Sequence, residues 1–98
     1  MENQFKAKLQ LRPKNEELFN FVISQLKKNN IQVTKIDELK EGVDVYITSS
    51  QFAVALAKLF KKRFKGIVKT SNSLTGEDHY GRIYKLTVLL RLPEQIDL

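Results

Sequence analysis

Cations recur at alternate positions in two stretches of the sequence where polar and apolar residues alternate. Lys6, Lys8 and Arg12 occupy the polar side of the first stretch, and Lys85 and Arg91 occupy that of the last. Alternate residues of a β-strand point to the same face of a sheet, so the pattern predicts a basic face. Such an array of charges can neutralise phosphates, which is the chemistry of binding a nucleic-acid backbone.

The overall charge agrees with an anionic partner but does not identify it. The 98 residues include 17 Lys or Arg and 11 Asp or Glu, which gives a net charge of +6. Nine basic and four acidic residues lie in the range 50–98, so the second half carries most of the excess. A basic half indicates nucleic acid, an acidic protein or a membrane surface. An ordinary lysine-rich surface would give the same count.

We predict two groups of phosphate-binding residues. The first lies on the polar sheet face, where Tyr46 offers a ring for stacking and Asp44 is the one acidic residue expected. Its members are Lys6, Lys8, Arg12, Tyr46, Lys69, Lys85 and Arg91. The second group lies at the end of the second predicted helix, where positive charge also suits the helix dipole. Its members are Lys61, Lys62, Arg63 and Lys65.

The polar sheet face does not match the standard RNA-recognition module. That module carries several aromatic residues on its middle strands. Here alternation places Phe5 with the apolar residues, so no aromatic on the first strand accompanies Tyr46. A plain solvated sheet face is the simpler alternative, because half-exposed sheets are normally polar on one side.

Catalysis is not indicated by the sequence. His79 stands beside Glu77 and Asp78, but consecutive residues of a loop do not converge on one point. The absence of cysteine excludes disulfides, thiol catalysis and a thiolate zinc site, and one histidine makes no His-rich metal site. The four glycines form no phosphate-binding loop. We therefore predict no enzymatic activity, no metal, no cofactor and no small-molecule substrate.

The sequence also gives no sign of a membrane protein. No apolar run approaches the roughly 20 residues that span a bilayer, and the first residues lack the pattern of a signal peptide. We expect a cytoplasmic, monomeric protein with one domain over residues 1–98, of which 93–98 form a loose tail.

Periodicity predicts five strands and two helices. Strands are expected at 5–12, 31–39, 43–48, 67–71 and 82–92, with a bulge near 35–37. Helices are expected at 16–29, after an N-cap at Asn15, and at 51–64, after a cap at Ser49 or Ser50. The helix faces expected in the core include Leu18, Val22, Leu56 and Leu59, among others. The many turn-forming residues of 72–81 predict a long loop between the last two strands.

The element order β-α-β-β-α-β-β is typical of a ferredoxin-like α+β fold with one extra edge strand. Both helices are expected to cover one face of a mainly antiparallel, five-stranded sheet. The last strand is expected at an edge, beside its hairpin partner. The sheet face without helices then carries the predicted basic residues.

Four segments of the chain resemble a known family. They are LQLR at 9–12, EGVDVYITSSQFA at 41–53, SNSLTGED at 71–78 and YKLTVLLRLP at 84–93. Together they resemble the adaptors of the large ribosomal subunit that are named for nonsense-mediated mRNA decay. The chain is similar to an archaeal-type member, in the domain that follows the zinc-ribbon region. Zinc binding and nuclear export are not carried over, because cysteines and an export tail are absent. Asn72 and Ser73 stand where family members commonly have two basic residues before the leucine that matches Leu74, which argues against phosphate binding by this loop tip.

The resemblance implies a non-enzymatic domain that docks on large-subunit RNA, on a ribosomal protein, or on both, during subunit biogenesis or transport. The alternative is a protein-interaction domain without direct RNA binding, in which the loop at 72–82 inserts into a partner. The residues of this partner loop are Leu74, Glu77, Asp78, His79, Tyr80 and Arg82.

Overall fold

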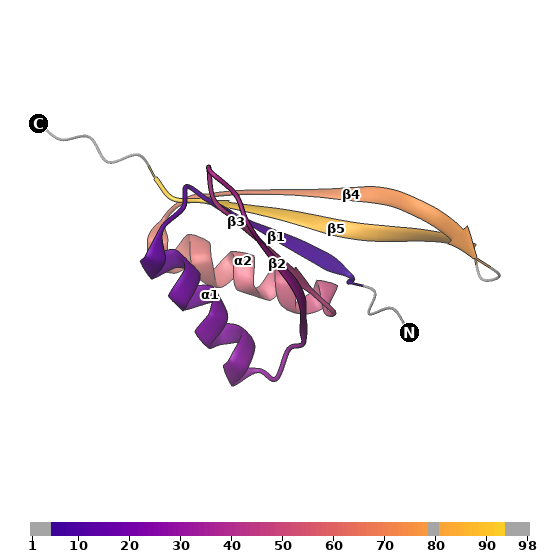
Figure 1. Ribbon diagram of the computed structural model, residues 1–98, viewed down its shortest axis with the longest axis horizontal. Coiled ribbons are helices and arrows are strands. Elements are labelled where there is room, and N and C mark those ends of the chain that lie inside the picture. Colours follow the sequence, from indigo (N-terminus) through magenta and orange to yellow (C-terminus); the bar gives the residue numbers. More distant parts are fainter. Residues whose placement is uncertain (1–4, 79–80, 94–98) are drawn as a thin grey trace, which may run out of the picture.

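The computed structural model describes residues 5–78 and 81–93, with 73–78 and 81–84 described by their backbone alone. The predicted order of five strands and two helices is confirmed (Figure 1). The elements are β1 (Ala7–Arg12), α1 (Glu16–Lys28), β2 (Val33–Glu38), β3 (Val43–Ile47), α2 (Ser50–Phe64), β4 (Ile67–Asp78) and β5 (Gly81–Arg91).

The strands form one five-stranded sheet in the order β2-β3-β1-β5-β4, with both helices on the same face (Figure 1). The pair β1–β5 is parallel and the other three pairs are antiparallel. The predicted α+β class, with a ferredoxin-like plan and one extra strand, is therefore confirmed. β5, which lies between β1 and β4, is the strand added to that plan.

The predicted position of the last strand was wrong. β5 lies inside the sheet between β1 and β4, and β4 takes the edge. The physical reason is burial, because a strand paired on both sides buries more apolar surface than an edge strand. Val88 and Leu90 of β5 are fully buried, whereas the polar residues Thr70 and Ser71 of β4 are exposed.

The predicted long loop at 72–81 was also wrong. Strand pairing continues to Asp78 and Gly81, so β4 and β5 form a long hairpin that extends beyond the other strands (Figure 1). The register shifts between Leu74 and Gly76, which indicates a β-bulge. Gly76 thus lies at an irregular place within a strand, and not in a loop. His79 and Tyr80 lie outside the described residues.

α1 begins at Glu16 as predicted, whereas α2 begins at Ser50, one residue before the predicted start. The Asn15 side chain accepts a hydrogen bond from the backbone N–H of Leu18 at 2.9 Å, and Ser49 Oγ accepts one from Phe52 at 3.0 Å. After α1, Asn30 takes the left-handed conformation with φ 56°. After α2, Lys65 takes the same left-handed conformation, with φ 55°. Gly66, which follows, is a site of close packing, because a Cβ atom there would lie 2.2 Å from the carbonyl oxygen of Arg91.

The core lies between the helices and one face of the sheet. Its fully buried side chains alternate along β1, β3 and β5, and Ala53 and Ala57 let α2 approach the sheet closely. Two predictions for the helices were inaccurate. Leu59 is 38% exposed, and Phe21, which the predicted stripe omitted, is buried.

Within the described residues, no helix has the length and apolar character that crossing a membrane requires.

Candidate nucleic-acid interface

Side chains on the sheet face opposite the helices lie in rows that cross the strands. Opposite residues of paired strands share a face, so the pairing register defines each row. One row carries Lys35, Tyr46, Lys8, Thr87 and Ser71, from β2 to β4. The next carries Asp37, Asp44, Gln10, Leu89 and Lys69. The register therefore brings Lys8, Tyr46 and Lys69 of the predicted set onto one open face.

Two residues of β2 belong to this face although the sequence prediction missed them. Lys35 lies opposite Tyr46, and Asp37 lies opposite Asp44. A register shift between Val33 and Lys35 marks the irregularity expected from the broken alternation. A bulge changes which residues share a face, so simple alternate counting could not assign the residues that follow it.

An aromatic pair stands on the open face. The rings of Phe5 and Tyr46 meet edge to face, with centroids 4.8 Å apart and an interplanar angle of 80°. Phe5 was predicted to point toward the core, and that prediction was wrong. Because β1 begins at Ala7, Phe5 precedes the strand, and strand alternation does not determine its direction.

Lysines surround the aromatic pair. Lys85 Nζ lies 3.8 Å from the centroid of the Phe5 ring. Lys35 Nζ and Lys8 Nζ lie 5.6 and 5.8 Å from the centroid of Tyr46. Ammonium groups at these distances are attracted by the π-electrons of a ring. We name Phe5, Tyr46, Lys8 and Lys85 the aromatic–lysine cluster.

The hydroxyl group of Tyr46 is held by an acidic neighbour. It donates a hydrogen bond of 3.4 Å to Asp37 Oδ2, which also pairs with Lys35 Nζ at 3.4 Å. Burial, the negative charges of Asp37 and Asp44, and the hydrogen bond to Asp37 raise the pKa of Tyr46 above its usual value of 10.0. Tyr46 is therefore a neutral phenol at physiological pH.

Arg12 is engaged within the protein. Its Nη2 donates to Asp44 Oδ1 at 2.8 Å, and its Nη1 donates to the carbonyl oxygens of Leu11 and Val43 at 3.0 and 3.4 Å. The two charged side chains are only 12% and 9% exposed. Arg12 thus neutralises a nearly buried carboxylate, and we leave it out of the surface that we propose for phosphates.

A family model for the second domain of NMD3 matches residues 4–92, which is nearly the whole chain. The chain belongs to the NMD3 family. No curated protein matches the sequence. NMD3 is a family of ribosomal-subunit export adaptors and is not a known enzyme family.

The other predicted cations of this NMD3 domain lie in different places. Lys6 and Lys69 are exposed, one just before β1 and the other on the edge strand β4. The cations at the end of α2 belong to the helical side of the sheet, and all are exposed. Among the predicted partner-loop residues, Leu74, Glu77, Asp78 and Arg82 lie in the β4–β5 hairpin.

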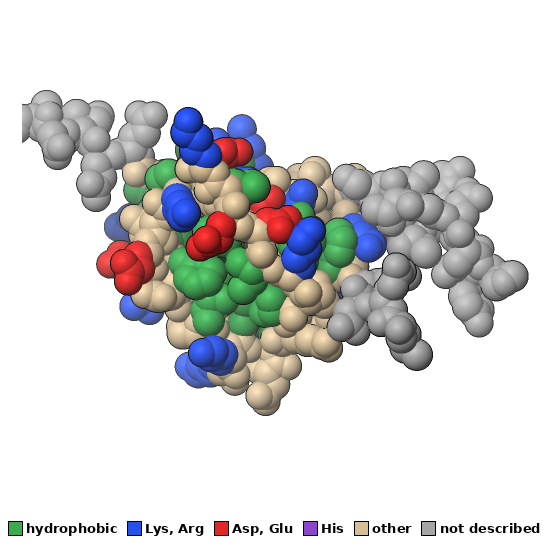
Figure 2. All heavy atoms as spheres, in the orientation of Figure 1, with side chains coloured by type: hydrophobic (Ala, Val, Ile, Leu, Met, Phe, Trp, Pro, Cys, Tyr) green, Lys and Arg blue, Asp and Glu red, His purple; other side chains and the backbone are tan. Residues whose placement is uncertain are grey.

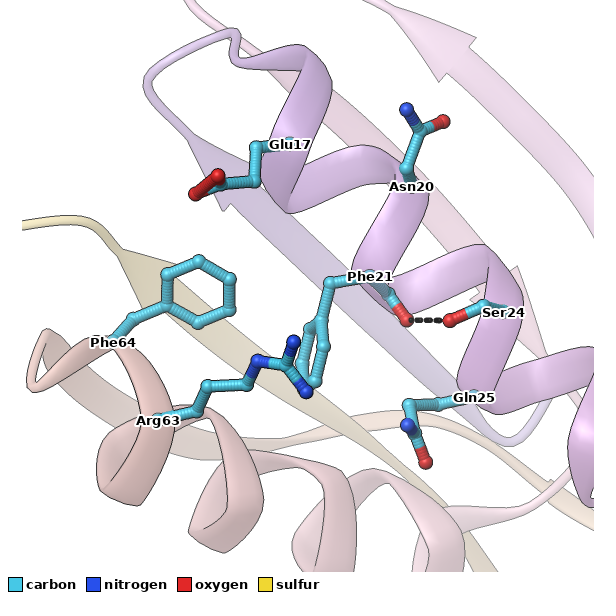
Figure 3. Close-up of a pocket in the computed structure, with 7 residues that line it drawn as sticks. All are labelled: Glu17, Asn20, Phe21, Ser24, Gln25, Arg63 and Phe64. Carbon is cyan, nitrogen blue, oxygen red and sulfur yellow. Dashed lines mark hydrogen bonds between the residues drawn. The ribbon is translucent and has the colours of Figure 1, made fainter.

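A groove separates the two helices of the NMD3 domain (Figure 3). It has a volume of about 540 Å³, and Arg63 lies in it with its Cζ atom 5.4 Å from the centroid of the Phe21 ring. The Phe21 and Phe64 rings pack edge to face, with centroids 5.1 Å apart. A neighbouring hollow of about 930 Å³ is lined by both Arg63 and Arg91. Arg91 lies opposite Arg12 in the sheet register, so its side chain belongs to the open face, and we name Lys61, Lys62, Arg63 and Lys65 the helix-end cluster.

Basic side chains are also exposed away from these clusters, among them Lys14, Lys27 and Lys28. Figure 2 shows Lys and Arg side chains along the rim of the visible face, and hydrophobic side chains over its middle. Charge density alone therefore does not locate a binding site on this NMD3 domain. Among the described residues, the contacts between lysines and aromatic rings lie on the open sheet face, whereas the cation–ring contact between the helices is made by Arg63.

Proposed function

We propose that this domain is a non-enzymatic docking module that binds ribosomal RNA of the large subunit during subunit biogenesis or transport. It would act in the cytoplasm as a monomer. The observation that carries the proposal is the aromatic–lysine cluster on the sheet face opposite the two described helices. Membership of a family of ribosomal-subunit adaptors supports the same conclusion.

The balance of charge on the open face favours an anionic partner. Asp44 is paired with Arg12, and Asp37 is paired with Lys35. Among the side chains that the structure describes, these are the only ion pairs, so the ammonium groups of Lys8 and Lys85 are not neutralised by a described carboxylate. Lysine side chains in this state can exchange their counterions for phosphates.

A ribosomal protein is the second candidate partner, through the β4–β5 hairpin. β4 is an edge strand of twelve residues, so one side of its backbone has no strand partner in the sheet. Such an edge can accept an additional strand from another protein. Ile67 at its start is 50% exposed, which adds an apolar contact. In this alternative the hairpin residues that were predicted as the partner loop contact the ribosomal protein, and the domain does not bind RNA directly.

Co-sedimentation with isolated large ribosomal subunits tests the proposal. The domain should pellet with subunits. The logarithm of its affinity should fall linearly with the logarithm of the salt concentration, with a slope of roughly −0.7 to −0.9 for each phosphate contacted. Lys8→Gln/Lys85→Gln should bind more weakly and show a smaller slope. Lys58→Gln, an exposed change on α2, is the matched control and should behave as the unchanged protein.

Two results would count against RNA docking on the open face. An affinity that does not depend on salt would favour the protein contact through the hairpin. Equal binding by Lys8→Gln/Lys85→Gln and Lys58→Gln would exclude the open sheet face as the interface.

A further inference from the structure

The aromatic pair on the open face is not needed to complete the core. Phe5 is half-buried, yet it is not among the hydrophobic residues packed against the buried core. The contacts of its ring that the structure gives are with the Tyr46 ring and with Lys85 Nζ. A large apolar side chain held on a water-facing sheet by another ring and an ammonium group is better suited to binding than to folding.

We propose that the aromatic–lysine cluster binds an unpaired base of single-stranded RNA, with the base stacked on one ring of the Phe5–Tyr46 pair and in contact with the edge of the other, and with Lys8 and Lys85 on the flanking phosphates. This inference rests on the proposed function and specifies the form of RNA that the site accepts. In a duplex the faces of each base are covered by neighbouring bases. Only an unpaired base can offer its face to a protein ring, so the pair selects single strands.

The arrangement of the lysines fits a strand of RNA that crosses the middle of the sheet. Lys8 belongs to β1 and Lys85 to β5, which are paired neighbours. Their ammonium groups lie over two different rings of the same pair, at 5.8 Å from Tyr46 and 3.8 Å from Phe5. A base that stacks on the pair would therefore have both cations nearby, and a flexible lysine stem can turn from the ring to a phosphate.

Asp37 limits the site on the side of β2. Its carboxylate accepts the Tyr46 hydroxyl hydrogen and pairs with Lys35, so it fixes the outer end of the ring and repels a nearby phosphate. The backbone of the RNA therefore runs over β1 and β5 and avoids β2. Replacing Asp37 by Asn removes the repulsion and releases Lys35, so Asp37→Asn should bind RNA more tightly.

Fluorescence anisotropy with two labelled RNAs tests this inference. One RNA is an unstructured pyrimidine-rich strand of about eight nucleotides, and the other is a fully paired hairpin. The single strand should bind more tightly than the hairpin. Phe5→Leu and Tyr46→Leu should each weaken binding of the single strand by about 5- to 150-fold, because stacking is lost, and should change hairpin binding little.

Matched variants separate stacking from other effects. Tyr46→Phe keeps the ring and should keep most of the affinity for the single strand. Lys58→Gln, on the helical side, should leave both affinities unchanged. Circular dichroism melting checks that Phe5→Leu and Tyr46→Leu remain folded. Asp37→Asn removes no ring, so its expected tighter binding of RNA can be tested independently of those two variants.

The results distinguish this inference from the proposed function. Single-strand affinity that is unchanged in both Phe5→Leu and Tyr46→Leu, or no preference over the hairpin, would overturn the inference. If those variants still pellet with large subunits in a salt-dependent way, the proposed function stands without it. If the unchanged domain binds the single strand by stacking but does not pellet with subunits, the proposed function fails and the base site remains.

Discussion

At the scale of single residues, the open face depends on how each charge is partnered. Arg12 and Asp44 form a nearly buried ion pair, whereas Lys8 and Lys85 lie against aromatic rings. A buried pair fixes structure, because either charge without the other would be costly. A lysine over a ring at the surface is held weakly and can still reach an anion. Residues of the same charge on one face thus take different roles.

The ion pair gives the first prediction. Arg12→Met should lower the free energy of unfolding by about 3 kcal/mol, because it leaves the Asp44 carboxylate in a nearly buried place without its partner. Urea denaturation measures the change. Arg12→Met/Asp44→Leu should recover part of the loss, since no unpaired charge remains. A double variant as unstable as the sum of the two single variants would contradict this account.

The second prediction concerns alkaline pH. The pKa of Tyr46 is higher in the folded protein than its usual value of 10.0, so the neutral phenol is favoured by folding. The resulting stabilisation is complete below pH 10.0 and is lost as the pH rises through the folded pKa. Tyr46→Phe should therefore lose less stability than the unchanged protein over this range, measured by thermal denaturation at each pH. An identical pH dependence in both proteins would contradict the shift.

At the scale of elements, the junction between α2 and β4 is set by contact with β5. A Cβ atom on Gly66 would lie 2.2 Å from the carbonyl oxygen of Arg91 and 2.7 Å from Phe60 Cζ. Gly66→Ala should therefore destabilise the fold by about 1 to 3 kcal/mol, because backbone or a buried ring must move. Urea denaturation measures the loss, with exposed Ser71→Ala as the control. A change as small as that of the control would show that the junction can relax.

The sequence predicted the elements better than their ends. Strict alternation identified the core side of β1 and β3. The hydrogen-bonding side chains before the helices identified the N-cap Asn15 and left the second cap between Ser49 and Ser50, of which Ser49 is the cap. Phe5 was misplaced because it lies before the strand, where the period of two no longer holds. Lys35 and Asp37 were missed because a register shift precedes them. Within the aromatic–lysine cluster only Phe5 lies at such a place, whereas Lys8, Tyr46 and Lys85 lie within β1, β3 and β5 and belong to the set predicted from the sequence.

At the scale of the whole molecule, the site depends on the position of β5. Local patterns predict that a strand exists but not which strands will lie beside it, because pairing is decided by total burial across the sheet. The parallel pairing of β5 with β1 places Lys8 opposite Thr87, and Lys85 is two residues before Thr87 on the same face. With β5 at the edge, Lys85 would lie far from Phe5. The sequence could therefore predict the lysines but not the cluster.

The two basic clusters give the last prediction, because they lie on different sides of the fold. Lys61→Gln/Lys62→Gln/Lys65→Gln should weaken binding to large subunits and lower the salt slope by roughly 0.7 to 0.9 for each phosphate that is no longer bound. It should leave the preference for single-stranded over hairpin RNA unchanged, because no aromatic ring of the open face is altered. Combined with Phe5→Leu, the losses should add, since distant sites act independently.

Co-sedimentation measures the first effect and anisotropy measures the second. Loss of the single-strand preference in Lys61→Gln/Lys62→Gln/Lys65→Gln would mean that one continuous surface, and not two, contacts the RNA. A salt slope unchanged by these three substitutions would instead mean that the helix-end lysines bind no phosphate. Their charge would then serve only to stabilise the C-terminal end of α2, where cations interact favourably with the helix dipole.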